Sequence, residues 1–139
     1  MDEETAVLAA NQAFYDAFGR RDLAAMEALW ARERPVACIH PGWPALLERG
    51  AVMQSWRQIL GSSGAPAIRC AHARAFVLEG AAFVVCYELL ADARLVATNI
   101  FAREGGAWRL VQHQAGPTPS PAQQPEEAPG AQKLSRRLH

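Results

Sequence analysis

The residue best suited to chemistry in this sequence is Glu88, which lies in the apolar segment "FVVCYELL" at positions 83–90. A carboxylate in such a segment costs free energy unless it is paired, hydrated or protonated. Glu88 is therefore our first candidate for a catalytic acid or base. The structural alternative is that Glu88 pairs with an arginine, such as Arg109 or Arg74.

His113 is the second candidate, because an imidazole with an unperturbed pKa near 6.5 exchanges protons at neutral pH. Side chains alternate between the two faces of a strand. This alternation puts Cys86, Asn99 and Phe101 on the face that carries Glu88, and we predict that all three contact a ligand. The same rule places alternate residues of the last predicted strand there too, namely Arg109, Val111, His113 and Ala115.

The stretch "VACIHPGWPAL" at positions 36–46 breaks a short apolar run with histidine, glycine, tryptophan and two prolines. It has two interpretations. In the first, His40 and Trp43 contact a ligand at the mouth of a pocket. In the second, Pro41 and Gly42 form a turn, His40 is a hydrogen-bonded strand end and Trp43 fills the core. Trp30 and Trp56 are the other tryptophans that we predict to form pocket walls, together with Phe101.

The sequence lacks the motifs of several classes of functional site. The histidines and cysteines show no short spacing such as C-x-x-C or H-x-x-x-H, so we expect no metal site. The sequence contains neither a G-x-G-x-x-G nor a phosphate-binding G-x-x-x-x-G-K-S/T motif, and it lacks G-x-S-x-G. We therefore expect no cofactor and no serine nucleophile.

Composition narrows the class of protein further. The chain has 139 residues, 50% of them hydrophobic, and a formal net charge of +0. A balanced charge argues against a nucleic-acid partner. No apolar run is long enough to span a membrane, and the acidic start lacks the features of a secretory signal. The odd cysteine count suggests buried free thiols in a cytoplasmic protein.

The sequence divides into a folded part and a tail. From position 117 it is rich in proline, glutamine and alanine, which disfavours helix and sheet alike. We predict one domain at 1–116 and a flexible tail at 117–139.

Periodicity predicts an α+β fold. Apolar residues recur at helical spacing over 3–19, with Gly19 as a stop, and again from an N-cap at Asp22 to Pro35. A third helix is expected over 48–61 and a short strand over 36–39. Four further strands are expected, at 67–79, 81–91, 94–104 and 107–115, joined by glycine-containing or short turns. We predict three N-terminal helices on one face of an antiparallel sheet.

Several of these segments resemble a known family. "RDLAAMEALWA", a strand ending "HPG", "SWRQIL" and "ATNIFAREGGAWRLVQHQAGP" are similar to SnoaL-like members of the NTF2-like superfamily, over roughly residues 3–117. The last segment is also similar to the kinase association domain. The resemblance implies a cystatin-like cone, in which the helices pack in the concave face of a curved antiparallel sheet. In the association-domain pattern, Glu88 and Asn99 fall at polar pocket positions.

The resemblance to ketosteroid isomerases within this superfamily is incomplete. Their catalytic tyrosine falls on Phe14, with the adjacent Tyr15 expected to point elsewhere, and their aspartate base falls near Cys38. The sequence therefore lacks the residues of that specific mechanism at the matching positions.

The outer sheet face is also predicted to be apolar, since alternation leaves Phe83, Val85, Tyr87, Val96, Ile100, Trp108 and Leu110 on it. A sheet that is apolar on both faces needs cover on both. We expect a homodimer packed through this face. Function remains open between two interpretations. The first is a non-catalytic dimerisation or binding module for a small apolar ligand. The alternative is a cofactor-independent isomerase, dehydratase or cyclase that acts on a small carbonyl compound through Glu88.

Overall fold

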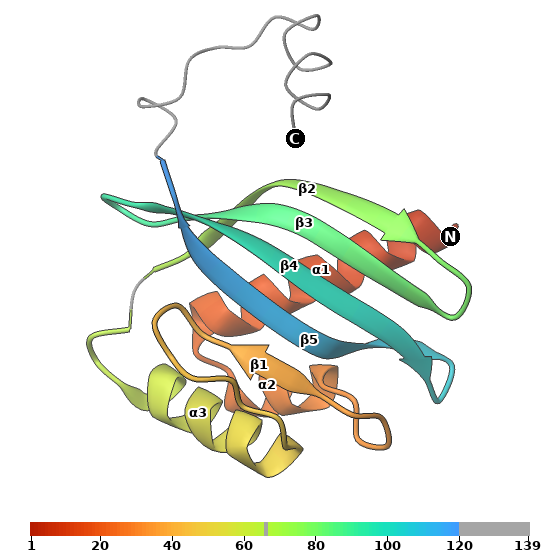
Figure 1. Ribbon diagram of the computed structural model, residues 1–139, viewed down its shortest axis with the longest axis horizontal. Helices are drawn as coiled ribbons and strands as arrows, with labels where there is room; N and C mark the ends of the chain where they lie inside the picture. Colours follow the sequence, from red (N-terminus) through yellow and green to blue (C-terminus); the bar gives the residue numbers. More distant parts are fainter. Residues whose placement is uncertain (66, 120–139) are drawn as a thin grey trace, which may run out of the picture.

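A five-stranded sheet curves over three helices in the computed structural model, which describes residues 1–65 and 67–119 (Figure 1). The helices are α1 (Glu3–Arg20), α2 (Leu23–Leu29) and α3 (Arg49–Gly61). The strands are β1 (Ala37–Ile39), β2 (Arg69–Val77), β3 (Ala81–Leu89), β4 (Arg94–Glu104) and β5 (Ala107–Thr118). Helix α1 runs across one face of the sheet, and α3 lies beside β1 (Figure 1). The predicted α+β architecture is confirmed.

The sheet has the strand order β1-β5-β4-β3-β2. Strands β2 to β5 form the predicted antiparallel meander. Strand β1 adds to its edge in the parallel direction, with Cys38 opposite His113. The sheet is therefore mixed, and β1 brings the segment that follows it next to the middle of β5.

The ends of the first two helices differ from the prediction. Helix α1 continues through Gly19 and ends where Arg21 takes a left-handed conformation with φ 55°. Asp22 caps α2 as predicted, accepting a hydrogen bond from the backbone of Ala25 at 3.0 Å. Helix α2 then ends well before Pro35, because the chain leaves it at Trp30 to bridge to β5.

The "HPGW" segment is a tight turn. The backbone N–H of Trp43 donates to the carbonyl of His40 at 2.9 Å, and Gly42 has φ 81°, which favours glycine. Beyond the turn, Leu46 and Cys38 exchange two backbone hydrogen bonds of 2.8 and 2.9 Å. The predicted turn at Pro41 and Gly42 is present, but Trp43 is 37% exposed and does not fill the core.

A bulge in β5 changes which side chains face inward. Asn99 pairs with His113 and Phe101 pairs with Leu110, so three residues of β4 oppose four of β5. The extra residue reverses the alternation in the first half of β5.

Because of this bulge, Trp108 and Leu110 lie in the core, with 8% and 0% of their surfaces exposed. The prediction that placed both on the outer face is wrong. Arg109, predicted on the pocket face, instead donates to the carbonyl of Ala28 at 2.7 Å. Simple alternation could not show this, because it assumes an uninterrupted strand.

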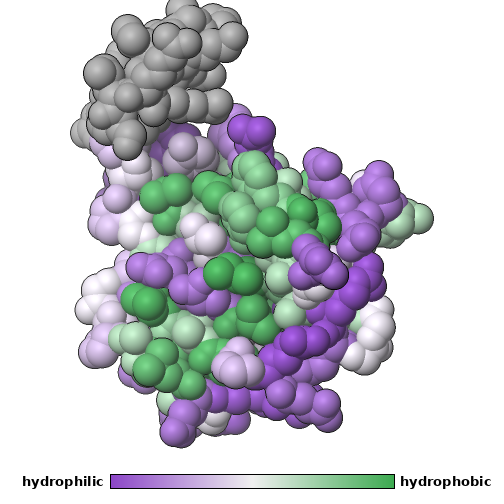
Figure 2. Space-filling view, turned by 45° about the vertical axis from the view of Figure 1, so that its right-hand side comes forward, coloured by the Kyte–Doolittle hydropathy of each residue, from purple (hydrophilic) through white to green (hydrophobic). Residues whose placement is uncertain are grey.

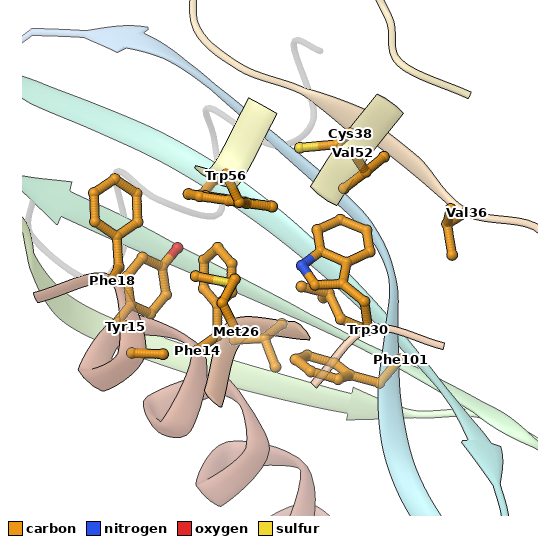
Figure 3. Close-up of a cluster of buried hydrophobic side chains, with 14 of the residues drawn as sticks. Phe14, Tyr15, Phe18, Met26, Trp30, Val36, Cys38, Val52, Trp56 and Phe101 are labelled. Atoms are coloured by element: carbon orange, nitrogen blue, oxygen red, sulfur yellow. The ribbon is translucent and has the colours of Figure 1, made fainter. Parts of the chain in front are cut away.

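Large buried aromatic and aliphatic side chains fill the space between the helices and the sheet (Figure 3). The Phe14 and Trp56 rings meet edge to face, with centroids 5.5 Å apart. Burial of each such side chain contributes about 1.5–3 kcal/mol. The core therefore fixes α1 and α3 relative to the strands that carry the polar candidates.

The outer sheet face keeps a half-buried apolar surface, formed by Phe83, Val85, Tyr87, Val96 and Ile100. Hydrophobic surface also covers much of the view in Figure 2 and is bordered by hydrophilic residues.

Strand β5 extends to Thr118, two residues past the predicted end of the domain at 116. Most of the predicted tail, 120–139, lies outside the described residues. Within the described part of the chain, no helix has the length and hydropathy needed to cross a membrane.

Candidate functional site

A pocket of about 320 Å³ opens between the sheet, α1, α3 and the turn after β1. Its size is at the lower end of the range for ligand pockets, roughly 300–1,000 Å³. Trp43 lies at its mouth with 37% of its surface exposed. The titratable side chains that line it are His40, Glu88 and His113, and its apolar lining consists of Phe18, Pro41, Trp43, Ile59, Ile68, Leu90 and Leu95.

Glu88 is 2% exposed and comes from β3. Its Oε2 accepts a hydrogen bond of 2.7 Å from the hydroxyl of Tyr15. The arginines proposed as partners have other contacts. Arg109 donates to a backbone carbonyl of α2, and Arg74 lies 5.5 Å from the centroid of a phenylalanine ring in its own strand. The partner of Glu88 is therefore a neutral phenol and not either of these arginines.

Tyr15 lies inside the site, which corrects the expectation that it points elsewhere. Besides donating to Glu88, its oxygen accepts a hydrogen bond of 3.1 Å from Nδ2 of Asn99. The sulfur of Cys86 is 3.3 Å from the same oxygen. Cys86, predicted to contact the ligand, thus lies behind Tyr15 and does not line the pocket.

Asn99 connects Tyr15 to His113. Its Nδ2 has two acceptors, the Tyr15 oxygen and Oδ1 of Asn11 at 2.9 Å. Its Oδ1 therefore faces Nδ1 of His113, at 2.6 Å. An amide oxygen can only accept, so Nδ1 of His113 carries the proton. The other ring nitrogen, Nε2, is then a bare acceptor 3.9 Å from Oε2 of Glu88.

Burial shifts both members of this pair towards their neutral forms. It raises the pKa of the Glu88 carboxyl above its ordinary value, and the hydrogen bond from Tyr15 offsets part of that shift. Burial, with a smaller contribution from His40, lowers the pKa of His113 to about 3. Removing charges from water is costly, so a protonated carboxyl beside a neutral imidazole is favoured over an ion pair.

His40 is also buried and neutral, because burial lowers its pKa to about 4. Its Nε2 lies 2.9 Å from the hydroxyl oxygen of Ser55. That hydroxyl donates its own proton to the carbonyl of Val52 at 2.7 Å, so Nε2 of His40 is the donor in the first bond. The His40 ring is held between Trp43 and Trp56, with centroids 4.9 and 4.8 Å away.

The structure brings some predicted residues together and separates others. His40, Trp43, Glu88 and His113 line one pocket, and Trp56 packs against the rings of both histidines. Trp30 and Phe101 lie in the closed core and not among the pocket residues. Figure 3 shows both rings on the side of the cluster that is away from Phe18.

Sequence reasoning missed three residues that organise the site, namely Asn11, Tyr15 and Ser55. One signal was available. Asn11 and Tyr15 are four positions apart and therefore share a face of α1. That face borders the apolar stripe, where an asparagine and a tyrosine hydroxyl need buried partners. Ser55 gave no comparable signal. No group of three or more His, Cys, Asp or Glu side chains within the described residues is placed to hold a metal ion.

Comparisons with known proteins agree with this fold. Residues 7–119 match the SnoaL-like domain family. A candidate dehydratase of the NTF2-like family from Streptomyces avermitilis is 31% identical, with a TM-score of 0.76 over 85% of this chain and 97% of that one. A candidate calcium/calmodulin-dependent protein kinase type II association domain from Thiobacillus denitrificans is 35% identical, with a TM-score of 0.68 over 81% and 94%.

A protein with a cystatin-like fold from Caulobacter vibrioides shares the fold at 14% identity, with a TM-score of 0.75 over 99% of both chains. No curated protein matches the sequence.

Proposed function

The chain belongs to the SnoaL-like domain family, and on that premise we propose that it is an enzyme of the dehydratase or isomerase class. Its substrate is a small, mostly apolar carbonyl compound, and its own side chains move the protons. Glu88 is the catalytic acid and His113 the catalytic base.

One observation carries this proposal. Two buried titratable groups, Glu88 and His113, line the same pocket. Oε2 of Glu88 and Nε2 of His113 are 3.9 Å apart. Glu88 accepts a hydrogen bond from Tyr15, and His113 donates one to Asn99. Both partners are neutral. A structural ion pair needs no such pocket, whereas acid–base catalysis needs positioned groups at the wall of a cavity that excludes water.

The pair accounts for a complete reaction cycle. Nε2 of His113 removes a proton from the carbon next to the substrate carbonyl. Protonated Glu88 gives its proton to the departing hydroxyl, which leaves as water and yields an unsaturated carbonyl compound. The pair is then imidazolium and carboxylate. Once the two atoms, 3.9 Å apart here, approach to hydrogen-bond distance, proton transfer from His113 to Glu88 restores the neutral pair. In an isomerisation, the proton returns to another carbon instead.

The comparison with the Streptomyces avermitilis protein, a candidate dehydratase at 31% identity, supports this class of reaction. The comparison with the association domain at 35% identity favours a second candidate function, a non-catalytic module that assembles or binds a ligand. The Glu88–His113 pair distinguishes them, because a purely assembling domain has no need of an acid and a base in its pocket.

Proton exchange tests the proposal without knowledge of the substrate. The protein is incubated in D₂O with a panel of small cyclic hydroxyketones and unsaturated ketones, and deuterium uptake beside the carbonyl is followed by NMR. We expect catalysed exchange for at least one compound. Glu88→Gln and His113→Gln should each reduce it by a factor of about 100 or more.

Glu79→Gln is the matched control, since Glu79 is an exposed carboxylate in the turn before β3. It should exchange at the rate of the unmodified protein. A panel in which no compound exchanges, or exchange that survives in Glu88→Gln, would favour the non-catalytic module.

A further inference from the structure

The two pocket histidines use their N–H groups on the protein and not on the pocket. His113 donates through Nδ1 to Asn99, and His40 donates through Nε2 to Ser55. A neutral imidazole has one donor and one acceptor nitrogen. The second nitrogen of each ring is therefore an acceptor: Nε2 of His113, 3.9 Å from Oε2 of Glu88, and Nδ1 of His40, 3.9 Å from the sulfur of Cys38.

A second hydrogen bond, made by Asn99 or by Ser55, fixes which nitrogen of each histidine carries the proton. The Asn99 amide cannot turn over without losing its bonds from Nδ2 to Asn11 and Tyr15, of 2.9 and 3.1 Å. The Ser55 hydroxyl cannot donate to His40, because its proton is used on Val52. Breaking such buried bonds is costly, so each tautomer is fixed before a ligand enters.

The two histidine rings border one small space. The His40 and His113 ring centroids are 6.3 Å apart, and both rings line the pocket with Glu88. Neither arginine nor lysine occurs among the described residues that line it. A ligand carboxylate or phosphate would meet bare nitrogens and a carboxyl group, without a cation to compensate for its lost hydration.

We propose that the pocket selects uncharged molecules that offer two hydrogen-bond donors, in the simplest case a diol, with one hydroxyl on Nε2 of His113 and the other on Nδ1 of His40. This inference rests on the proposed function for the role of the pocket, and it adds two hydroxyl groups to the carbonyl compound proposed above as the substrate. Trp43 at the mouth supplies an aromatic edge for the apolar part of the ligand.

Three probes of similar size test the selectivity: resorcinol, its dimethyl ether and benzoate. Dissociation constants are measured by NMR titration, with the Trp43 indole signal as the reporter. We expect resorcinol to bind at least tenfold more tightly than the dimethyl ether, which offers only acceptors. Benzoate should bind more weakly than either.

Two variants change whether the pocket histidines accept or donate a hydrogen bond towards the ligand. Asn99→Asp retains the acceptor for Nδ1 and adds a charge that favours imidazolium, so Nε2 of His113 becomes a donor. A donor binds an ether oxygen as well as a hydroxyl, so the preference for resorcinol should fall at least tenfold. Ser55→Ala frees the His40 ring to present its N–H, and the preference should fall at least threefold. Gln114→Glu and Gln54→Ala are matched controls at exposed positions.

The tautomers themselves are read from imidazole nitrogen NMR signals of the unmodified protein, which needs no variant to fold. Protons on Nδ1 of His113 and Nε2 of His40 are expected. The opposite tautomers, equal affinity for resorcinol and its ether, or tightest binding of benzoate would overturn the inference. If resorcinol is preferred while no ketone exchanges protons, the inference holds and the proposed catalysis fails.

Discussion

The hydroxyl of Tyr15 on α1 donates a hydrogen bond of 2.7 Å to Glu88 on β3, across 73 positions of sequence. This bond joins the first helix to the end of β3, where Glu88 lines the pocket. It also holds the carboxyl beside His113, whose Nε2 lies 3.9 Å from the same oxygen. The position of helix α1 is therefore coupled to the positions of the proposed acid, Glu88, and the proposed base, His113.

Removal of that bond should weaken the fold measurably. Tyr15→Phe leaves Oε2 of Glu88 and one proton of the Asn99 amide without their partner. Unsatisfied buried groups cost about 1–3 kcal/mol each in unfolding free energy, which urea denaturation measures. Tyr87→Phe is the control, because Tyr87 is half-buried on the outer face, and it should change stability by less than about 0.5 kcal/mol. Equal effects of the two variants would mean that the Tyr15 bond contributes nothing specific.

Replacement of Glu88 by glutamine should stabilise the protein as pH rises. Burial raises the pKa of Glu88 in the folded state above its ordinary value. Its contribution to stability is therefore complete below pH of about 4.5 and is lost as pH rises through the raised pKa. Glu88→Gln removes that loss, so its thermal melts should match or exceed those of the unmodified protein at neutral pH. A marked loss of stability at pH 7 would indicate a structural carboxylate.

Acid should destabilise the fold through its buried histidines. Burial lowers the pKa of His113 to about 3 and of His40 to about 4, whereas an unfolded histidine titrates near 6.5. The unfolded chain binds more protons in this window, so stability falls as pH drops from about 6.5 towards about 4, by up to about 1.4 kcal/mol per pH unit for each group. Urea denaturation across this range should show a smaller slope for His40→Gln. His72→Gln, at an exposed position, is the matched control.

The apolar outer face predicts self-association. We propose that a second copy covers Phe83, Val85 and Tyr87, which are only half-buried in the single chain. Val85→Glu would bury a charge in that interface and should give a monomer by light scattering, whereas Gln54→Glu on the exposed face of α3 should not. A monomeric unmodified protein at micromolar concentration would contradict the proposal.

Local patterns were sufficient for most of the fold. The alternation in β3 and the hairpin glycines follow from the geometry of strands and turns, so they can be recognised without tertiary information. The bulge in β5 could not, because nothing in the sequence around Val111 marks the extra residue. That one residue decides whether Trp108 lies in the core or on the surface.

Strand alternation predicts which strand residues face the site. It does not predict which helix residues contact them. Glu88, Asn99 and His113 share a face through alternation alone. Tyr15 was missed because its contact with Glu88 depends on how α1 is rotated against the sheet, and core packing sets that rotation. Trp30 was misassigned because its position depends on where α2 ends, and that end is set by a bridge to β5.

The titration of Glu88 tests the central claim most directly, and it can be followed in the unmodified protein through the ¹³C signal of its carboxyl carbon. The proposed acid–base pair predicts that the carboxyl stays protonated above pH 4.5, its ordinary value, while His113 remains neutral over the same range. A carboxylate already ionised below that pH, beside a His113 that carries two ring protons, would show a structural ion pair and contradict the proposed catalysis.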